Sequence, residues 1–217
     1  MMIIQRSKNP YGDKHDLFRT SRVEFQKGAT ILVGRNGAGK TTMLRYIQEH
    51  CKAKNIPFFL WDNYTEGGDH MKSRYLWEDD LQGLAQTMIA SEGEQIAFNL
   101  GRQAKKIGIF RRDNLQSESI VILMDAVDSG LDAYNIKTVQ EFLNLILKDT
   151  PTQDVYIIMS ANNYALVRNM PCLDVRSGQY VTFASYEDYE QFVSKQYEEE
   201  DDDKQEKPRQ TRGRKPW

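Results

Sequence analysis

The sequence has few of the residues that build disulfides and metal centres. Its 217 residues include two cysteines and three histidines, and Cys51 and Cys172 each stand alone, outside any metal-ligand spacing. A disulfide framework is therefore not expected, and a reducing cytoplasm is the default compartment. No apolar run approaches the ~18 residues of a membrane span, and the first residues lack the apolar stretch of a signal peptide. We therefore expect a cytoplasmic protein without a membrane partner.

The sequence also lacks a strong excess of either charge. Its formal net charge is -2, which neither favours nor excludes nucleic acid as a partner. The last residues differ from the rest, because an acidic run at 198–203 is followed by basic residues among Pro, Gln and Gly up to Lys215. Such a composition cannot form a core, so we expect one domain at 1–196 and a disordered tail at 197–217. The tail is either simply solvated or a basic arm that binds a partner.

One segment of eight residues carries the strongest functional signal. Residues 34–41 read Gly-Arg-Asn-Gly-Ala-Gly-Lys-Thr and fit the pattern G-x-x-x-x-G-K-[ST] of a phosphate-binding loop. Glycines let such a loop wrap around an anion. Lys40 supplies a charge for the β- and γ-phosphates, and the Thr41 hydroxyl is placed to ligate Mg²⁺. We therefore predict a nucleotide-binding protein, with these candidate contacts: Gly34, Arg35, Asn36, Gly37, Ala38, Gly39, Lys40, Thr41 and Thr42.

Predicted strands and helices alternate along the chain. Continuous apolar runs predict buried strands at 30–33, 56–61, 120–125 and 155–160. Shorter patterns predict strands at 2–5, 17–19 and 22–25, and a hairpin of 173–175 with 180–183. Helical spacing predicts helices at 42–51, 79–90, 91–107, 132–148 and 186–197. This alternation predicts an α/β fold with a mainly parallel central sheet, and a small helical region at about 62–112.

A second motif is the apolar run Ile-Val-Ile-Leu-Met at 120–124, which is followed directly by Asp125. An aspartate in this position holds the hydration shell of Mg²⁺ in phosphate-loop enzymes, so Asp125 and Thr41 are the candidate metal-binding residues. By itself this pattern is weak evidence. Two neighbouring segments strengthen it, namely Ser-Glu-Gly-Glu-Gln at 91–95 and Ser-Gly-Leu-Asp at 129–132.

These segments together resemble the motifs of the ATP-binding-cassette ATPases: phosphate loop, signature loop, metal-binding aspartate and D-loop. Residues 31–42 are close to the family's I-x-G-x-N-G-A-G-K-[ST]-T, and the resemblance covers about residues 15–185. It implies a P-loop NTPase fold in which two copies pair head to tail around two ATP molecules. Ser91 and Gly93, from the signature of one copy, would then meet the γ-phosphate bound to the other.

Several positions depart from the family's pattern. Ala126 stands where the family has its general base, and Asp128 is the nearest carboxylate that could position the attacking water. Asn162 or Asn163 stands near the family's switch histidine, and an amide can hydrogen-bond a phosphate but carries no charge. Lys40, Asp128 and Asn162 are therefore the candidate catalytic residues, with ATP binding expected and fast hydrolysis not expected.

Two further features of the site stay open in the sequence. The family's glutamine after the second strand is missing, and Asp62 or Asn63 occupies that neighbourhood. The adenine could be held by an aromatic residue such as Phe18 or Tyr11, or by the backbone alone.

Four functions are compatible with the phosphate loop, and the other motifs favour them to different degrees. The first is an ATPase that dimerises on Mg-ATP and clamps or remodels a partner, with the pair Arg111-Arg112 and the basic tail favouring DNA or RNA metabolism. The second is an ATP-binding switch or scaffold with little hydrolysis, which Ala126 favours. A transporter subunit is disfavoured by the short distance from Lys40 to Ser91. A P-loop kinase would leave residues 91–95 and 129–132 unexplained.

Overall fold

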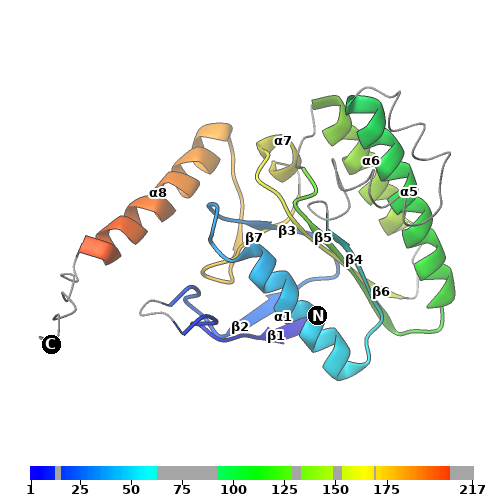
Figure 1. Cartoon of the computed structure of the whole chain (residues 1–217), viewed down its shortest axis with the longest axis horizontal. Coiled ribbons are helices and arrows are strands. Elements are labelled where there is room, and N and C mark those ends of the chain that lie inside the picture. The colour runs from blue at the N-terminus through cyan, green and yellow to red at the C-terminus, as the bar shows by residue number, and fades with distance from the viewer. Residues whose placement is uncertain (13–15, 63–91, 129–132, 149–152, 169, 206–217) are drawn as a thin grey trace, which may run out of the picture.

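A computed structural model describes residues 1–12, 16–62, 92–128, 133–148, 153–168 and 170–205 of the chain. Its centre is a six-stranded sheet with the order β4-β5-β6-β3-β7-β8 (Figure 1). The strands are β3 (Gly28–Val33), β4 (Phe58–Asp62), β5 (Ser119–Asp125), β6 (Asp154–Ser160), β7 (Cys172–Asp174) and β8 (Tyr180–Val181). All neighbouring strands are parallel except β7 and β8, which form the predicted hairpin. The predicted α/β fold with a mainly parallel sheet is confirmed.

Helices cover both faces of this sheet. Helix α1 (Lys40–Lys54) packs on one face together with a small antiparallel sheet of β1 (Met2–Gln5) and β2 (Arg22–Phe25). Helices α5 (Glu92–Asp113) and α6 (Ala133–Lys148) pack on the other face. The remaining described helices are α7 (Tyr164–Val167) and α8 (Tyr186–Gln205). Among the described residues, no helix combines the length and the apolar character that crossing a membrane requires.

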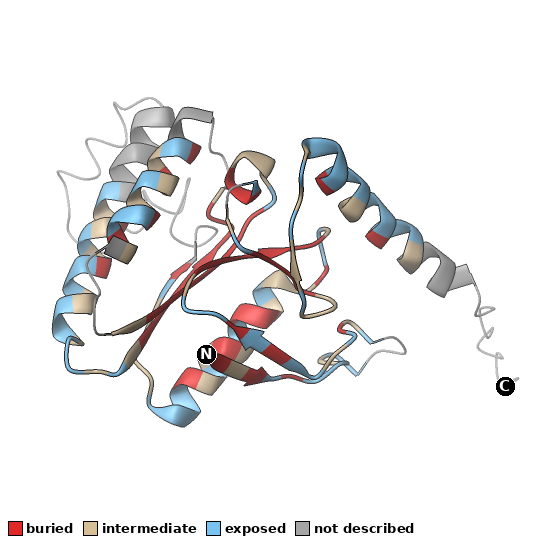
Figure 2. Ribbon diagram, turned by 180° about the vertical axis from the view of Figure 1, so that it is seen from behind, coloured by how far each residue is buried: buried red, intermediate tan, exposed pale blue. Residues whose placement is uncertain are grey.

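The alternation of side chains along each strand divides the buried residues into two cores. In β5, Ile120, Ile122 and Met124 contact the α6 side, whereas Val121 and Leu123 contact the α1 side. Successive side chains of a strand point to opposite faces, so a strand that is covered on both faces must be apolar throughout. Figure 2 shows the result, with buried strands at the centre and a largely exposed α8 at the edge. The continuous apolar runs of the sequence therefore correspond to the central strands.

One predicted strand is absent, and one predicted helix is longer than expected. Residues 17–19 form no strand, because Phe18 is fully buried against the phosphate loop rather than paired in a sheet. The last helix is longer than predicted, since α8 continues past Tyr197 through the acidic run to Gln205. The division into a domain at 1–196 and a disordered tail at 197–217 stays a prediction. The predicted helix at 79–90 and the basic residues after position 205 lie outside the described residues.

Candidate functional site

The predicted phosphate loop connects the end of β3 to the start of α1. Gly34, Gly37 and Gly39 have φ angles of 147°, 80° and 95°, in the region that side chains disfavour. Gly39 is the N-cap residue of α1, and a Cβ atom on it would lie 2.7 Å from a ring carbon of Phe18. Both the backbone angle and the lack of space therefore require glycine at this position. The loop ends at a helix N-terminus, where backbone N–H groups and the helix dipole favour an anion.

A cavity of about 330 Å³ lies against this loop. Its walls come from the loop, from the end of β5 and from the end of β6, which meet because the carboxyl ends of parallel strands lie at the same edge of a sheet. The described lining residues are Tyr11, Leu17, Asn36, Gly37, Gly39, Lys40, Thr41, Thr42, Asp125, Ala126, Asp128, Ser160, Ala161 and Asn162. The structure thus brings the three candidate catalytic residues and both candidate metal-binding residues into one cavity.

The other predicted contact residues have different places. Gly34 and Arg35 line a second cavity of about 250 Å³ that is bounded by α8, and Ala38 is buried. Gly93 lies in the first turn of α5, whereas Ser91 lies outside the described residues. The predicted D-loop at 129–132 also lies outside them.

Lys40 is held inside the loop by backbone carbonyl groups. Its Nζ donates hydrogen bonds to the carbonyl oxygens of Gly34 at 2.7 Å and Arg35 at 3.2 Å. Burial lowers the pKa of Lys40 from its ordinary value of 10.5 to about 8, while the nearby carboxylates of Asp128 and Asp125 act in the opposite direction. The ammonium is therefore short of compensating negative charge, which a phosphate group would supply.

Asp125 is oriented by a serine that the sequence analysis missed. The Ser160 hydroxyl donates a hydrogen bond to Asp125 Oδ1 at 2.5 Å and accepts one from the backbone N–H of Ala126 at 2.7 Å. Ser160 is the last residue of β6, beside the end of β5, and is buried. The signal in the sequence was the position of Ser160, a polar residue at the end of a predicted apolar strand.

The cavity has the oxygen donors that Mg²⁺ prefers. Asp125 and Thr41, which carry a carboxylate and a hydroxyl, line the same cavity as Lys40. Within the described ranges, no group of three or more His, Cys, Asp or Glu residues could hold a metal by itself. Two protein oxygens suit an ion that keeps waters and binds substrate phosphates, as Mg²⁺ does. The residues present therefore fit Mg²⁺ together with a nucleotide.

Asp128 connects the end of β5 to the loop after β6. Its Oδ2 accepts hydrogen bonds from the backbone N–H groups of Asn162 at 2.6 Å and Asn163 at 2.5 Å. The Asn163 side chain accepts from the N–H of Ala165 and so caps α7, which leaves its oxygen engaged. The Asn162 amide instead reaches toward the phosphate loop, 3.4 Å from Asn36 Oδ1. Of the two asparagines, Asn162 is the one that faces the cavity.

The two aromatic candidates for adenine contact are distinguished by burial. Phe18 has no exposed surface and packs against Gly39, which disfavours it among the open alternatives for adenine contact. Tyr11 is 62% exposed, lines the cavity and shares a 2.6 Å hydrogen bond with the Thr42 hydroxyl. Asp62 ends β4 in register with Asp125, whereas Asn63 lies outside the described residues.

A match to a family model agrees with a nucleotide site. Residues 30–176 match the family model described as ATPase family associated with various cellular activities (AAA). Among solved structures, the chain is similar to cbiO1 from Clostridium perfringens, described as part of the ABC transporter complex cbiONQ. That match has 14% sequence identity, covers 91% of each chain and has a TM-score of 0.44. A comparison with curated proteins found no match.

Proposed function

Since this chain belongs to the ATPase family associated with various cellular activities, we propose that it hydrolyses Mg-ATP in the cavity beside the phosphate loop. The nucleotide binds at the interface of a head-to-tail homodimer, and binding and hydrolysis clamp or remodel a partner. The observation that carries this proposal is the convergence of Lys40, Asp125 and Asp128 on one cavity. Lys40 lies at the start of α1, whereas Asp125 and Asp128 lie at and just after the end of β5, and the folded sheet brings these two segments together.

Each residue has a role in binding the triphosphate. The backbone N–H groups of the loop and the N-terminus of α1 bind phosphate oxygens, and the Lys40 ammonium exchanges its carbonyl partners for the β- and γ-phosphates. Asp125 and Thr41 would hold Mg²⁺, with Ser160 orienting Asp125. The metal would supply positive charge against the negative charge of the phosphates during transfer.

Asp128 is the residue we assign to the attacking water. Among the described residues, two backbone N–H groups donate to its Oδ2, and we assign Oδ1 to accept a hydrogen bond from water in the cavity. Asn162 lies beside it and donates to the γ-phosphate from the neutral amide. The hydrogen bonds from the loop after β6 hold the Asp128 carboxylate in place. We therefore expect slower hydrolysis than in an enzyme whose general base can adjust its position.

The start of α5 supports the proposed dimer. The helix begins at Glu92, so the predicted signature residues Ser91 and Gly93 flank a helix N-terminus that would face the partner's γ-phosphate. ATP then supplies contacts that only the closed dimer makes, and hydrolysis removes them. The features that favour a partner in DNA or RNA metabolism are Arg111 and Arg112 at the end of α5 and the basic residues of the tail.

A second candidate is an ATP-binding switch or scaffold that hydrolyses little. The observation that favours it is Ala126, whose φ of 51° and whose N–H bond to Ser160 fix the backbone at the position where the cassette ATPases carry their base. A methyl group there cannot accept a proton. In this alternative, ATP binding alone closes the dimer and its release opens it.

The test combines ATP turnover with light scattering on the wild type, Lys40→Ala and Asp128→Asn. We expect the wild type to bind Mg-ATP, dimerise and turn it over slowly, and Lys40→Ala to lose binding. Lys54→Ala, at an exposed lysine in the last turn of α1, is the matched control and should bind like the wild type. Asp128→Asn should bind ATP and stay dimeric without turnover. A wild type that dimerises without turnover supports the switch, and one that binds no ATP overturns both candidates.

A further inference from the structure

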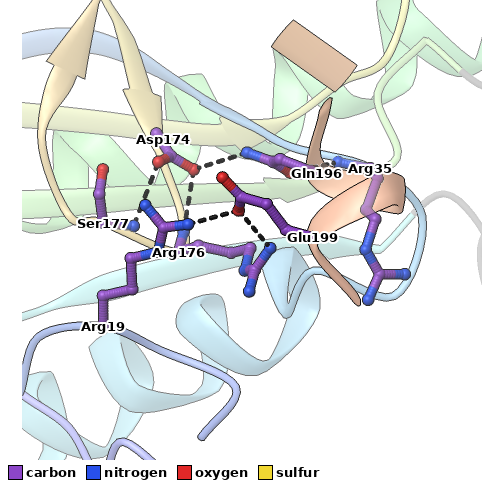
Figure 3. A network of polar contacts seen from close by, with 7 residues as sticks. All are labelled: Arg19, Arg35, Asp174, Arg176, Ser177, Gln196 and Glu199. Carbon is purple, nitrogen blue, oxygen red and sulfur yellow. Dashed lines mark hydrogen bonds and ion pairs between the residues drawn. The ribbon is translucent and has the colours of Figure 1, made fainter. Parts of the chain in front are cut away.

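Helix α8 contacts the phosphate loop through a buried glutamine. Gln196 is 6% exposed, although most described residues of α8 are exposed or half-buried. Its Oε1 accepts a hydrogen bond from the backbone N–H of Arg35 at 3.0 Å, and its Nε2 donates to Asp174 Oδ1 at 3.1 Å (Figure 3). Both ends of the amide are therefore satisfied, as a buried polar group requires. One side chain connects the beginning of the phosphate loop to the end of β7.

The packing around this contact leaves little freedom to the loop. A Cβ atom on Gly34 would lie 3.3 Å from Gln196 Oε1, 3.3 Å from Val175 and 3.1 Å from Ala38. The first residue of the loop is thus enclosed by α8, by the segment after β7 and by the loop itself. A shift of Gln196 would move the backbone that leads into the phosphate-binding residues.

Neighbouring residues of α8 strengthen the same contact. Glu199 forms ion pairs with Arg19 and with Arg176, the latter at 3.3 Å (Figure 3). The guanidinium of Arg35 lies over the ring of Tyr197, 5.3 Å from its centre. The helix turn at 196–199 therefore contacts the loop through a hydrogen bond and a cation–π contact, and is anchored nearby by ion pairs.

The other end of α8 reaches the second wall of the nucleotide cavity. The Tyr189 hydroxyl donates a hydrogen bond to the backbone carbonyl oxygen of Asn162 at 3.0 Å. Its ring is buried against Tyr164 and Phe183. Burial raises the pKa of Tyr189 to about 12, so the hydroxyl keeps its proton as a donor at neutral pH. Asn162 is a residue of the cavity lining, so α8 contacts both the phosphate loop and the loop after β6.

We propose that α8 braces the two loops of the nucleotide site, with Gln196 and Tyr189 as its positioning residues, so that nucleotide binding and the seating of α8 stabilise each other. Neither residue touches the nucleotide, and each acts through a backbone group of a loop that does. Coupling between ATP binding and the packing of α8 is reciprocal. If packed α8 raises the affinity for ATP, bound ATP must stabilise the packing of α8 by the same free energy. This inference rests on the proposed function, because it requires that ATP binds beside the phosphate loop.

The first experiment measures the affinity for a fluorescent ATP analogue with Mg²⁺. Gln196→Met keeps the length of the side chain but removes both hydrogen bonds, and we expect about fivefold to tenfold weaker binding. Gln191→Met makes the same chemical change at an exposed position of the same helix and should bind within about twofold of the wild type. Equal affinities for Gln196→Met and Gln191→Met would overturn the role of Gln196.

A second pair of variants tests the hydrogen bond from Tyr189 to the loop after β6 and keeps the buried aromatic ring. Tyr189→Phe removes the hydroxyl and keeps the buried ring, and we expect about threefold to fivefold weaker binding. Tyr186→Phe removes the hydroxyl of a tyrosine that is 52% exposed on the same helix, and serves as the control. If both variants bind like the wild type, Tyr189 has no positioning role.

Hydrogen exchange separates positioning from a purely structural role. In the wild type, saturating Mg-ATP analogue should slow amide exchange across residues 186–199, and this protection should be reduced in Gln196→Met. A structural role alone would lower the unfolding temperature of the variant and leave affinity and protection unchanged. A wild type that binds the analogue without protecting α8 overturns the brace alone. A wild type that binds no analogue overturns the ATPase proposal and the brace with it.

Discussion

Asp128 Oδ2 accepts a hydrogen bond from the backbone N–H of Asn163 at 2.5 Å, across 35 residues of sequence. The same oxygen accepts a second bond from the N–H of Asn162 at 2.6 Å. One carboxylate thus fixes the loop that carries Asn162 into the nucleotide cavity. Asp128 has a structural role in this contact, beside the catalytic role that we propose for it.

The two roles of Asp128 can be separated by substitution. Asp128→Asn keeps an acceptor oxygen for the backbone N–H groups but removes the charge, so we expect the free energy of unfolding to fall by about 1 kcal/mol or less and turnover to be lost. Asp128→Ala removes the acceptor as well and should cost about 1–3 kcal/mol and weaken ATP binding. Denaturant unfolding and single-turnover assays check both. Normal turnover in Asp128→Asn would exclude it as the residue that positions water.

The affinity for ATP should depend on the protonation of Lys40. Because burial lowers the pKa of Lys40 to about 8, the free protein loses the ammonium as pH rises above that value. ATP binds the charged form, so its affinity should fall above pH 8 by up to about tenfold per pH unit, the limit for one proton. Titrations between pH 7 and 9.5 measure this. A flat profile would show that Lys40 keeps its charge throughout.

Above pH 8, the contribution of Lys40 to the stability of the nucleotide-free protein should rise with pH, whereas the affinity for ATP should fall. The folded pKa of about 8 lies below the ordinary value of 10.5, so between these pH values the unfolded chain binds more protons than the folded chain. The contribution of Lys40 to the free energy of unfolding therefore rises with pH in this window. The difference between wild type and Lys40→Met, measured by denaturant unfolding at pH 7.5 and 10, should show this rise.

Gly39 should tolerate no side chain. Gly39→Ala places a Cβ atom 2.7 Å from a carbon of the Phe18 ring at a φ of 95°, and we expect a loss of about 2 kcal/mol or more in the free energy of unfolding, together with loss of ATP binding. Gly108→Ala is the control, because Gly108 lies in α5 with no atom within 4 Å of its added Cβ. This control should gain about 0.5–1 kcal/mol. Equal stability of the two variants would contradict the packing argument.

Ser160 should support metal binding through Asp125. Ser160→Ala leaves Asp125 Oδ1 and the N–H of Ala126 without their hydroxyl partner in a buried place, so we expect a loss of about 1–3 kcal/mol in the free energy of unfolding. A higher Mg²⁺ concentration should be needed for half-maximal ATP binding, since Asp125 is no longer oriented. Ser194→Ala, at an exposed position of α8, should change neither quantity. An unchanged Mg²⁺ requirement in Ser160→Ala would contradict this role.

Features that depend on neighbours along the chain could be predicted from the amino-acid sequence. The phosphate loop at 34–41 needs glycines at set intervals between a strand and a helix, and the continuous apolar runs belong to strands covered on both faces. The prediction of a P-loop ATPase made from these patterns is confirmed by the family match over residues 30–176. Spacing of this kind is visible in sequence because steric limits and helix or strand periods act between residues a few positions apart.

Contacts between residues that are distant in the sequence depend on how the strands pair and how the helices pack. Ser160 reaches Asp125 because β5 and β6 pair in a register that places Met124 opposite Met159. The sequence of either strand alone does not predict which strand it pairs with. The same holds for Gln196, a polar residue on an exposed helix, whose partner is a backbone N–H of the phosphate loop. Serine and glutamine are common at exposed positions, so the residue type alone does not predict which distant group each side chain will contact. Burial in the folded protein removes water and makes each hydrogen bond necessary.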